Sequence, residues 1–157
     1  MNIRPIKLKK LILYVAVTFA FGIVGALLGG GVTQTYTALN KPPLSPPGVV
    51  FPIVWSILYL LMGIGAYFLS NEKNPQISNL LKLYWVQLIF NALWPLIFWR
   101  FGAFNLAAAI IVAILILMII LTIGASKINK LSSLLFVPYI IWLIFALYLN
   151  IGISILN

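Results

Sequence analysis

The stretch AAAIIVAILILMIILTI, residues 107–123, decides the fold class because it is almost continuously apolar. Strands of a transmembrane barrel alternate in polarity over about 10 residues, so this run indicates a membrane-spanning helix instead. Such a helix needs roughly 20 apolar residues to cross about 30 Å of hydrocarbon. Four further apolar stretches have a similar length, and the predicted helices cover residues 9–29, 46–70, 79–100, 104–126 and 131–155.

The composition supports the same class. The 157 residues are 64% hydrophobic and 7% charged, and the mean hydropathy is +1.16, values outside the range of water-soluble domains. The connections after the second, third and fourth predicted helices are only a few residues long. We therefore predict an all-α integral membrane protein in which residues 1–157 form a single bundle of five transmembrane helices.

The basic residues predict how the bundle is oriented. A positive start before an apolar run is also typical of a signal peptide, but this run is long and lacks an Ala-x-Ala cleavage site. Positive charge is retained on the cytoplasmic side, so we expect a cytoplasmic N-terminus and an outer C-terminus. Topology and contact with anionic lipid explain the net charge of +9 without nucleic acid. The cytoplasmic set is Arg4, Lys7, Lys9, Lys10, Lys73, Lys82, Lys127 and Lys130, against Lys41 and Arg100 outside.

Missing residue types exclude several chemistries. The chain has no cysteine and no histidine, which removes disulfides, thiolate metal sites and histidine catalysis. The only acidic residue, Glu72, lies in a loop, which weighs against a proton-driven transporter. Each lysine is at a helix end or in a loop, which disfavours a Ser/Lys hydrolase. We predict no metal and no cofactor.

Polar and aromatic residues share one face of the third predicted helix: Tyr84, Gln87, Asn91, Trp94 and Phe98. The amides of Gln87 and Asn91 need partners at membrane depth, either across a helix–helix contact or on a ligand in a cavity. Trp85 and Trp99 fall on other faces, near the two ends of the helix, and are predicted to be interfacial anchors.

The neighbouring helices carry matching stripes. Trp55 and Tyr59 recur at helical spacing in the second, and Trp142 and Ala146 in the fifth. Packing together with an interfacial aromatic belt is the alternative explanation for Trp55. Two prolines, Pro95 and Pro138, remove backbone hydrogen bonds and favour helices that bend around a space. Rings and neutral amides beside small residues favour a large, flat and mostly apolar ligand.

The longest connection, Gly29–Gly48, is expected to be an ordered lid over the mouth of the bundle. It begins with three glycines and ends with four prolines, which restrict the backbone angle φ. Loops of this length are usually functional. Ser45 is predicted to be the N-cap of the second helix, which would then begin near Pro46.

Four motifs carry a family resemblance: YTALNKPPLSPP (36–47), PIVWSILYLLMG (52–63), QLIFNALWP (87–95) and PYIIWLIFALYLN (138–150). In order and spacing they resemble the tryptophan-rich sensory protein family, which includes the mitochondrial translocator protein. The resemblance covers essentially the whole chain. It implies a five-helix bundle, often a homodimer, that acts as a membrane translocator or sensor and binds porphyrins and sterol-like lipids under the first loop. By motif position, the pocket residues it implies are Pro46, Trp55, Tyr59, Gln87, Asn91, Trp94, Trp142 and Ala146.

The resemblance leaves alternatives open. Bound porphyrin could instead be degraded in light and oxygen with Trp55 and Trp142 taking part, or the protein could be a scaffold without a ligand. Thr35 and Leu44 stand where the family often has tryptophans, which predicts a weaker lid. A Gly25-x-x-x-Gly29 spacing suits either a dimer interface or packing within the bundle.

Overall fold

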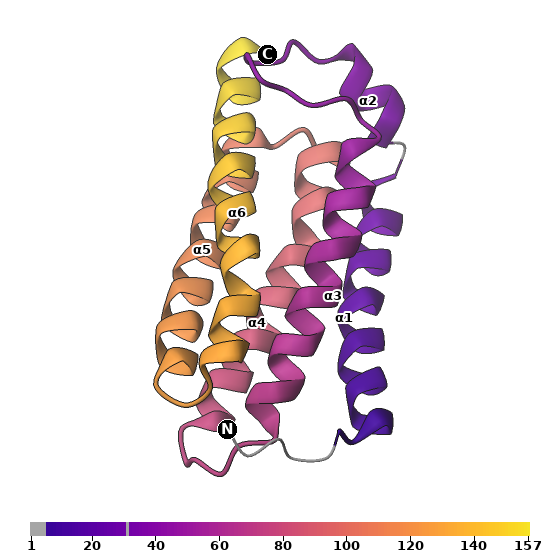
Figure 1. Cartoon of the computed structure of the whole chain (residues 1–157). Coiled ribbons are helices and arrows are strands. Elements are labelled where there is room, and N and C mark those ends of the chain that lie inside the picture. Colours follow the sequence, from indigo (N-terminus) through magenta and orange to yellow (C-terminus); the bar gives the residue numbers. More distant parts are fainter. Residues whose placement is uncertain (1–5, 31) are drawn as a thin grey trace.

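Five long helices stand side by side in the computed structural model, which describes residues 6–30 and 32–157 (Figure 1). Within these residues, five helical segments are long and apolar enough to cross a membrane. The predicted all-α membrane fold is therefore confirmed. The elements are α1 (Leu8–Gly29), α2 (Val32–Ala38), α3 (Val50–Ser70), α4 (Ile77–Pro95), the π-helical η1 (Leu96–Arg100), α5 (Phe104–Ser126) and α6 (Lys130–Leu156).

The helices form a closed ring. Around the bundle, α1 packs on α3, α3 on α6, α6 on α5, α5 on α4, and α4 again on α1. The start of α1 and the end of α6 lie at opposite ends of the bundle (Figure 1). The lid, residues 32–49, crosses the end that also holds the C-terminal end of α6.

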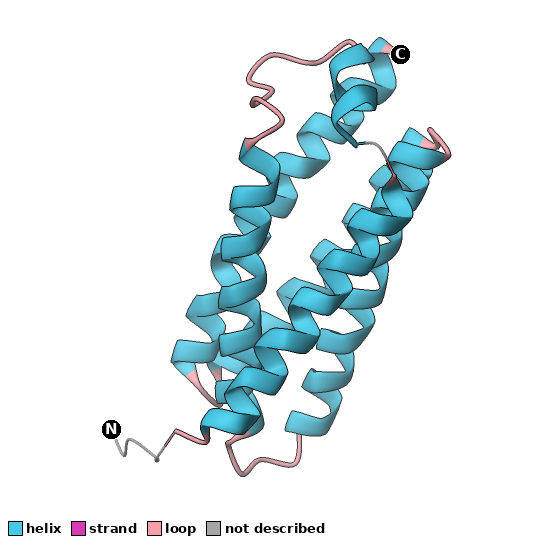
Figure 2. Cartoon of the chain, turned by 90° about the vertical axis from the view of Figure 1, so that its right-hand side faces the viewer, coloured by secondary structure: helices cyan, strands magenta, loops and turns pink. Residues whose placement is uncertain are grey.

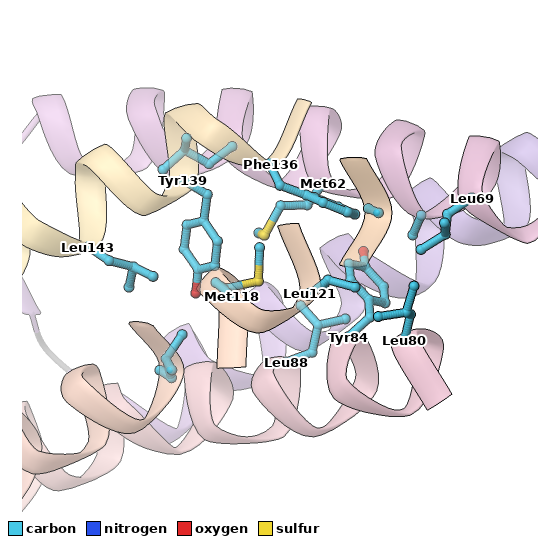
Figure 3. Packing of buried hydrophobic residues seen from close by; sticks show 14 of the residues in the cluster. Met62, Leu69, Leu80, Tyr84, Leu88, Met118, Leu121, Phe136, Tyr139 and Leu143 are labelled. Carbon is cyan, nitrogen blue, oxygen red and sulfur yellow. The ribbon is translucent and has the colours of Figure 1, made fainter. Parts of the chain in front are cut away.

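The half of the bundle away from the lid, which we call the closed half, is filled with side chains. Buried aliphatic, methionine and aromatic residues from α3, α4, α5 and α6 interdigitate there (Figure 3). Glycines let the helices approach: a Cβ added to Gly63 would lie 2.8 Å from the Cα of Val15, and one on Gly65 would lie 2.9 Å from the Phe136 ring. Close packing of this kind is the main attraction between helices in lipid.

The first helix packs on both α3 and α4, and its contacts shift towards α4 near the lid. In the closed half it contacts α3 through Val15 and Gly63, whereas nearer the lid its buried glycines, Gly25 and Gly29, lie against Ala92 and Pro95 of α4. The Gly25-x-x-x-Gly29 spacing therefore serves packing within the bundle. As a result α1 leans towards α4 and diverges from α3 below the lid (Figure 2).

The start of the second transmembrane helix differs from the prediction. This helix, α3, begins at Val50 and not near residue 46, and Ser45 does not cap it, because its hydroxyl donates to the Pro42 carbonyl at 2.7 Å. A residue that precedes a proline is disfavoured in the α-conformation, and the consecutive Pro46 and Pro47 impose this on two positions. The helix therefore starts only after them.

The structure contains two further elements that the sequence pattern did not predict, α2 and η1. The long first connection contains the short helix α2, which was expected to be loop. The third transmembrane helix also changes at Pro95, which lacks an N–H, and continues as the π-helical turn η1.

Candidate functional site

A cavity of about 600 Å³ lies in the half of the bundle under the lid, which we call the open half. Its wall takes residues from all five transmembrane helices, from η1 and from the lid. The volume is in the usual range for small-molecule sites. Four tryptophans line it: Trp55, Trp94, Trp99 and Trp142.

Six of the eight residues implied by the family resemblance lie at this cavity: Trp55, Tyr59, Asn91, Trp94, Trp142 and Ala146. They come from α3, α4 and α6, so the fold brings together motifs that are far apart in the sequence. Their contact with a ligand stays a prediction. The other two residues, Pro46 and Gln87, are not part of the wall.

Gln87 lies beneath the cavity, one helical turn from Asn91 towards the closed half. It is fully buried, and its Nε2 has only the Met62 sulfur, at 4.0 Å, as an acceptor. Its Oε1 has no hydrogen-bond partner among the described residues. The helical stripe placed Gln87 on the correct face, but the cavity ends above it. Pro46 belongs to the lid, where its carbonyl accepts a hydrogen bond from the Tyr36 hydroxyl at 2.7 Å.

Asn91 joins three helices at the floor of the cavity. Its Oδ1 accepts a hydrogen bond from the Tyr59 hydroxyl at 2.7 Å, and its Nδ2 donates to the Tyr139 oxygen at 2.5 Å. This amide therefore bonds across helices and also lines the cavity, and its contact with a ligand stays a prediction. The same bonds orient the Tyr59 ring, which lies 5.4 Å from Trp55 in a stacked arrangement.

Trp94 is fixed in the same way. Its indole N–H donates to Asn150 Oδ1 at 3.1 Å, and Asn150 Nδ2 donates to the Phe104 carbonyl at 2.8 Å. These two hydrogen bonds join α4, α6 and the start of α5. The Trp94 ring also stacks on Phe98 at 4.7 Å, so one face of the indole is covered. Tyr59 and Trp94 are therefore both held in place by neighbouring residues of the bundle.

Trp99 corrects an expectation. It was predicted to be an interfacial anchor, but it lines the cavity. The prediction assumed 100° per residue, whereas η1 has the wider i→i+5 turn, which changes the direction of side chains after Pro95. Trp85 does lie away from the wall and stacks on Tyr14 at 5.7 Å.

The lid supplies the roof through Tyr36, which the helical stripes could not identify. Its buried ring meets Phe51 edge-on at 5.2 Å and Trp99 at 6.0 Å. Burial raises the pKa of the Tyr36 phenol above its usual value, so the hydroxyl keeps the proton that it donates. Lys41 Nζ donates to the carbonyls of Tyr36 and Leu39, both at 2.9 Å, and so ends α2.

The wall has a limited chemistry. None of the residues that line it in the described part of the chain is charged, and most of its surface is aromatic or aliphatic. Its indoles and phenols offer flat faces together with a few hydrogen-bonding groups. Of the two positions where the family often has tryptophan, neither Thr35 nor Leu44 lines the cavity, and Leu44 is 82% exposed.

Known proteins resemble this chain along most of its length. Residues 14–156 match the TspO/MBR family. Tryptophan-rich protein TspO of Archaeoglobus fulgidus is 33% identical over 150 residues, 94% of this chain and 97% of that protein. Protein CrtK of Rhodobacter capsulatus is 36% identical over 140 residues, 87% and 85% of the two chains. Translocator protein of Homo sapiens is 34% identical over 120 residues, 73% and 70% of the two chains.

These matches agree with the architecture. The matched region includes all of the cavity wall and most of every transmembrane helix. The chain therefore belongs to the TspO/MBR family of integral, multi-pass membrane proteins.

Proposed function

We propose that this protein binds a flat, mostly apolar ligand of the tetrapyrrole class, such as protoporphyrin, in the cavity of the open half. The observation that carries the proposal is the wall itself: four indoles surround about 600 Å³ of uncharged space at membrane depth. A conjugated ring stacks on such faces, and its edge groups meet amides and hydroxyls without burial of a protein charge.

The contacts among the rings support a preformed site. Trp55 packs face-on against Tyr59 and edge-on against Tyr139 at 6.0 Å, while Trp142 meets Phe51 edge-on at 6.2 Å. Side chains that are already ordered lose less conformational entropy when a ligand binds. The cavity therefore favours a rigid ring over a flexible chain.

The charge distribution supports the orientation expected from the sequence. Lys7, Lys9 and Lys10 precede or begin α1, and Lys73, Lys82, Lys127 and Lys130 flank the turns at the same end of the bundle. Lys41 and Arg100 lie at the lid end, while Arg4 is outside the described residues. By the positive-inside rule, the N-terminus faces the cytoplasm and the lid faces outward.

The other readings stay predictions. They are light- and oxygen-dependent porphyrin degradation at Trp55 and Trp142, a homodimer, and a scaffold role without a ligand. A scaffold role without a ligand does not explain the cavity of about 600 Å³.

The test is a titration of the purified protein with protoporphyrin, followed by the absorbance and fluorescence of the porphyrin. Replacement of both Trp55 and Trp142 by Ala removes two stacking faces and should weaken binding at least roughly tenfold. Trp85→Ala is the matched control, because Trp85 is the one tryptophan of the chain that does not line the cavity.

Saturable binding that weakens in the double variant and not in Trp85→Ala would support the proposal. Binding that does not saturate, or that is equally strong in all three proteins, would reject it. Repetition in the dark and under illumination separates a binding protein from a degrading one. Loss of the porphyrin spectrum that requires light, oxygen and both tryptophans would favour degradation.

A further inference from the structure

The cavity wall is exposed on one side only. Apart from Tyr36 of the lid, its buried members, among them Asn91, Ile111 and Leu143, come from α4, α5 and α6. Its exposed members come from α1, the lid and the start of α3, and include Ala26, Gly48 and Pro52. The cavity therefore opens between α1 and α3, where Figure 2 shows the two helices diverging towards the lid.

This opening lies at membrane depth. Ala26 is inside the span Leu8–Gly29 and Pro52 is inside the span Val50–Ser70, so their exposed surfaces face lipid. On the α1 edge, Ala26 is too small to cover the gap. Gly22 has the Tyr59 ring directly against it, which closes the gap on the side of the closed half.

The lid end, in contrast, is fastened. Tyr148 of α6 donates a hydrogen bond to the Pro43 carbonyl at 2.7 Å. Asn157 Oδ1 accepts from the Asn40 N–H and its Nδ2 donates to the Asn40 carbonyl, both at 2.9 Å. Pro42 packs so closely on Gly152 that a Cβ added there would lie 2.6 Å from the Pro42 Cβ. The roof residue Tyr36 is bonded within the lid as well.

We infer that the ligand enters and leaves the cavity sideways from the lipid leaflet on the lid side, through the gap between α1 and α3, while the lid stays closed. We call this gap the portal. The inference rests on the proposed binding function. An apolar ring that has already dissolved in the bilayer reaches the portal without returning to water, and every residue named on its edge is uncharged.

The test compares a narrowed portal with a locked lid in phospholipid vesicles, with binding of protoporphyrin followed by stopped-flow porphyrin fluorescence. Ala26→Trp narrows the portal, and Ala109→Trp adds the same ring to an exposed position of α5 away from the cavity. Pro52→Trp narrows the portal from α3 and replaces Ala26→Trp if that variant does not fold.

The chain has no cysteine, so Pro42→Cys with Gly152→Cys introduces a single pair. This pair can lock the lid to α6 once the two Cβ positions, 2.6 Å apart, separate to the roughly 3.5–4.5 Å of a disulfide. The reduced form of the same double variant is its control. We expect the narrowed portal to slow association roughly tenfold or more, and the locked lid and Ala109→Trp to change it less than about twofold.

Any other pattern overturns the portal. In particular, a locked lid that slows binding as much as the narrowed portal would show access through the roof, and unchanged rates in all variants would show that neither route limits binding. The proposed function is judged separately from the unmodified protein. If that protein shows no saturable binding, the binding proposal fails and the portal fails with it.

Discussion

The closed and open halves of this bundle are built from the same five helices, yet one is filled and the other holds a cavity. In the closed half, Met62, Leu69, Met118 and Leu121 are fully buried in the hydrophobic core (Figure 3). In the open half, aromatic rings surround a cavity of about 600 Å³. The difference lies in how the helices are held apart or together.

Lipid explains why the open half need not collapse. Lipid tails are as apolar as the cavity wall, so little hydrophobic force drives the helices inward. Directional bonds then set the spacing: Asn91 spans α3, α4 and α6, and Asn150 spans α4, α5 and α6. The closed half instead depends on shape, through glycines that admit a neighbouring helix. Packing defects should therefore destabilise the closed half, and loss of polar or aromatic groups should disturb the cavity wall of the open half.

The largest expected effect comes from a bulky side chain at a closed helix contact. Gly63→Leu pushes a side chain into the backbone of Val15 and should lower the free energy of unfolding by about 3 kcal/mol, the upper end for overpacking. Ala26→Leu adds the same side chain to α1 in the open half, where there is room. Unfolding in mixed detergent micelles measures both, and equal losses would contradict the comparison.

A smaller effect is expected when the closed half loses volume. Phe136→Ala removes a fully buried ring that packs on Tyr84 and Gly65, and should cost about 2 kcal/mol, less than in water-soluble cores because lipid reduces the transfer contribution. Porphyrin affinity should not change. The matched variant Phe51→Ala should lower porphyrin affinity with little loss of stability. If Phe136→Ala instead lowered the affinity and Phe51→Ala lowered the stability, the comparison of the two halves would be wrong.

The sequence predicted the fold and the part of the wall that lies on regular helices. Apolar length placed the five spans, and helical spacing found Trp55, Asn91, Trp94 and Trp142 wherever the helix keeps 100° per residue. Prediction failed where that rule ends. Trp99 follows the π-helical turn, and the depth of Gln87 depends on where the cavity floor lies, which spacing along a single helix does not define.

The lid shows the same limit. Its prolines favour an ordered segment, which stays a prediction, but Tyr36 reaches the roof through contacts with Phe51 and Trp99, which are distant in sequence. The sequence also did not predict which surface α1 packs against. Two glycines in one spacing fit a dimer or an internal contact, and only their place against Ala92 and Pro95 decides between them.

The amide bridge of the open half gives the third test. Asn91→Leu keeps the approximate volume but removes both hydrogen bonds, the one accepted from Tyr59 and the one donated to Tyr139, and should cost about 1 kcal/mol in stability. Porphyrin affinity should also fall, because the Tyr59 ring that packs on Trp55 is no longer held. Thermal unfolding and titration of the same variant check the two effects. Full affinity would mean that the wall does not depend on the bridge.

The smallest expected effect comes from the equivalent polar contact of the closed half. Thr18 donates its hydroxyl proton to the Tyr14 carbonyl, so the Tyr84 hydroxyl must be the donor in the bond between Thr18 and Tyr84. Thr18→Val leaves that phenol without its acceptor and should cost about 0.6 kcal/mol, the average for polar contacts between membrane helices. Shape already holds this half, so ligand affinity should stay unchanged. A loss as large as that of Asn91→Leu, measured by the same unfolding, would mean that directional bonds matter equally in both halves.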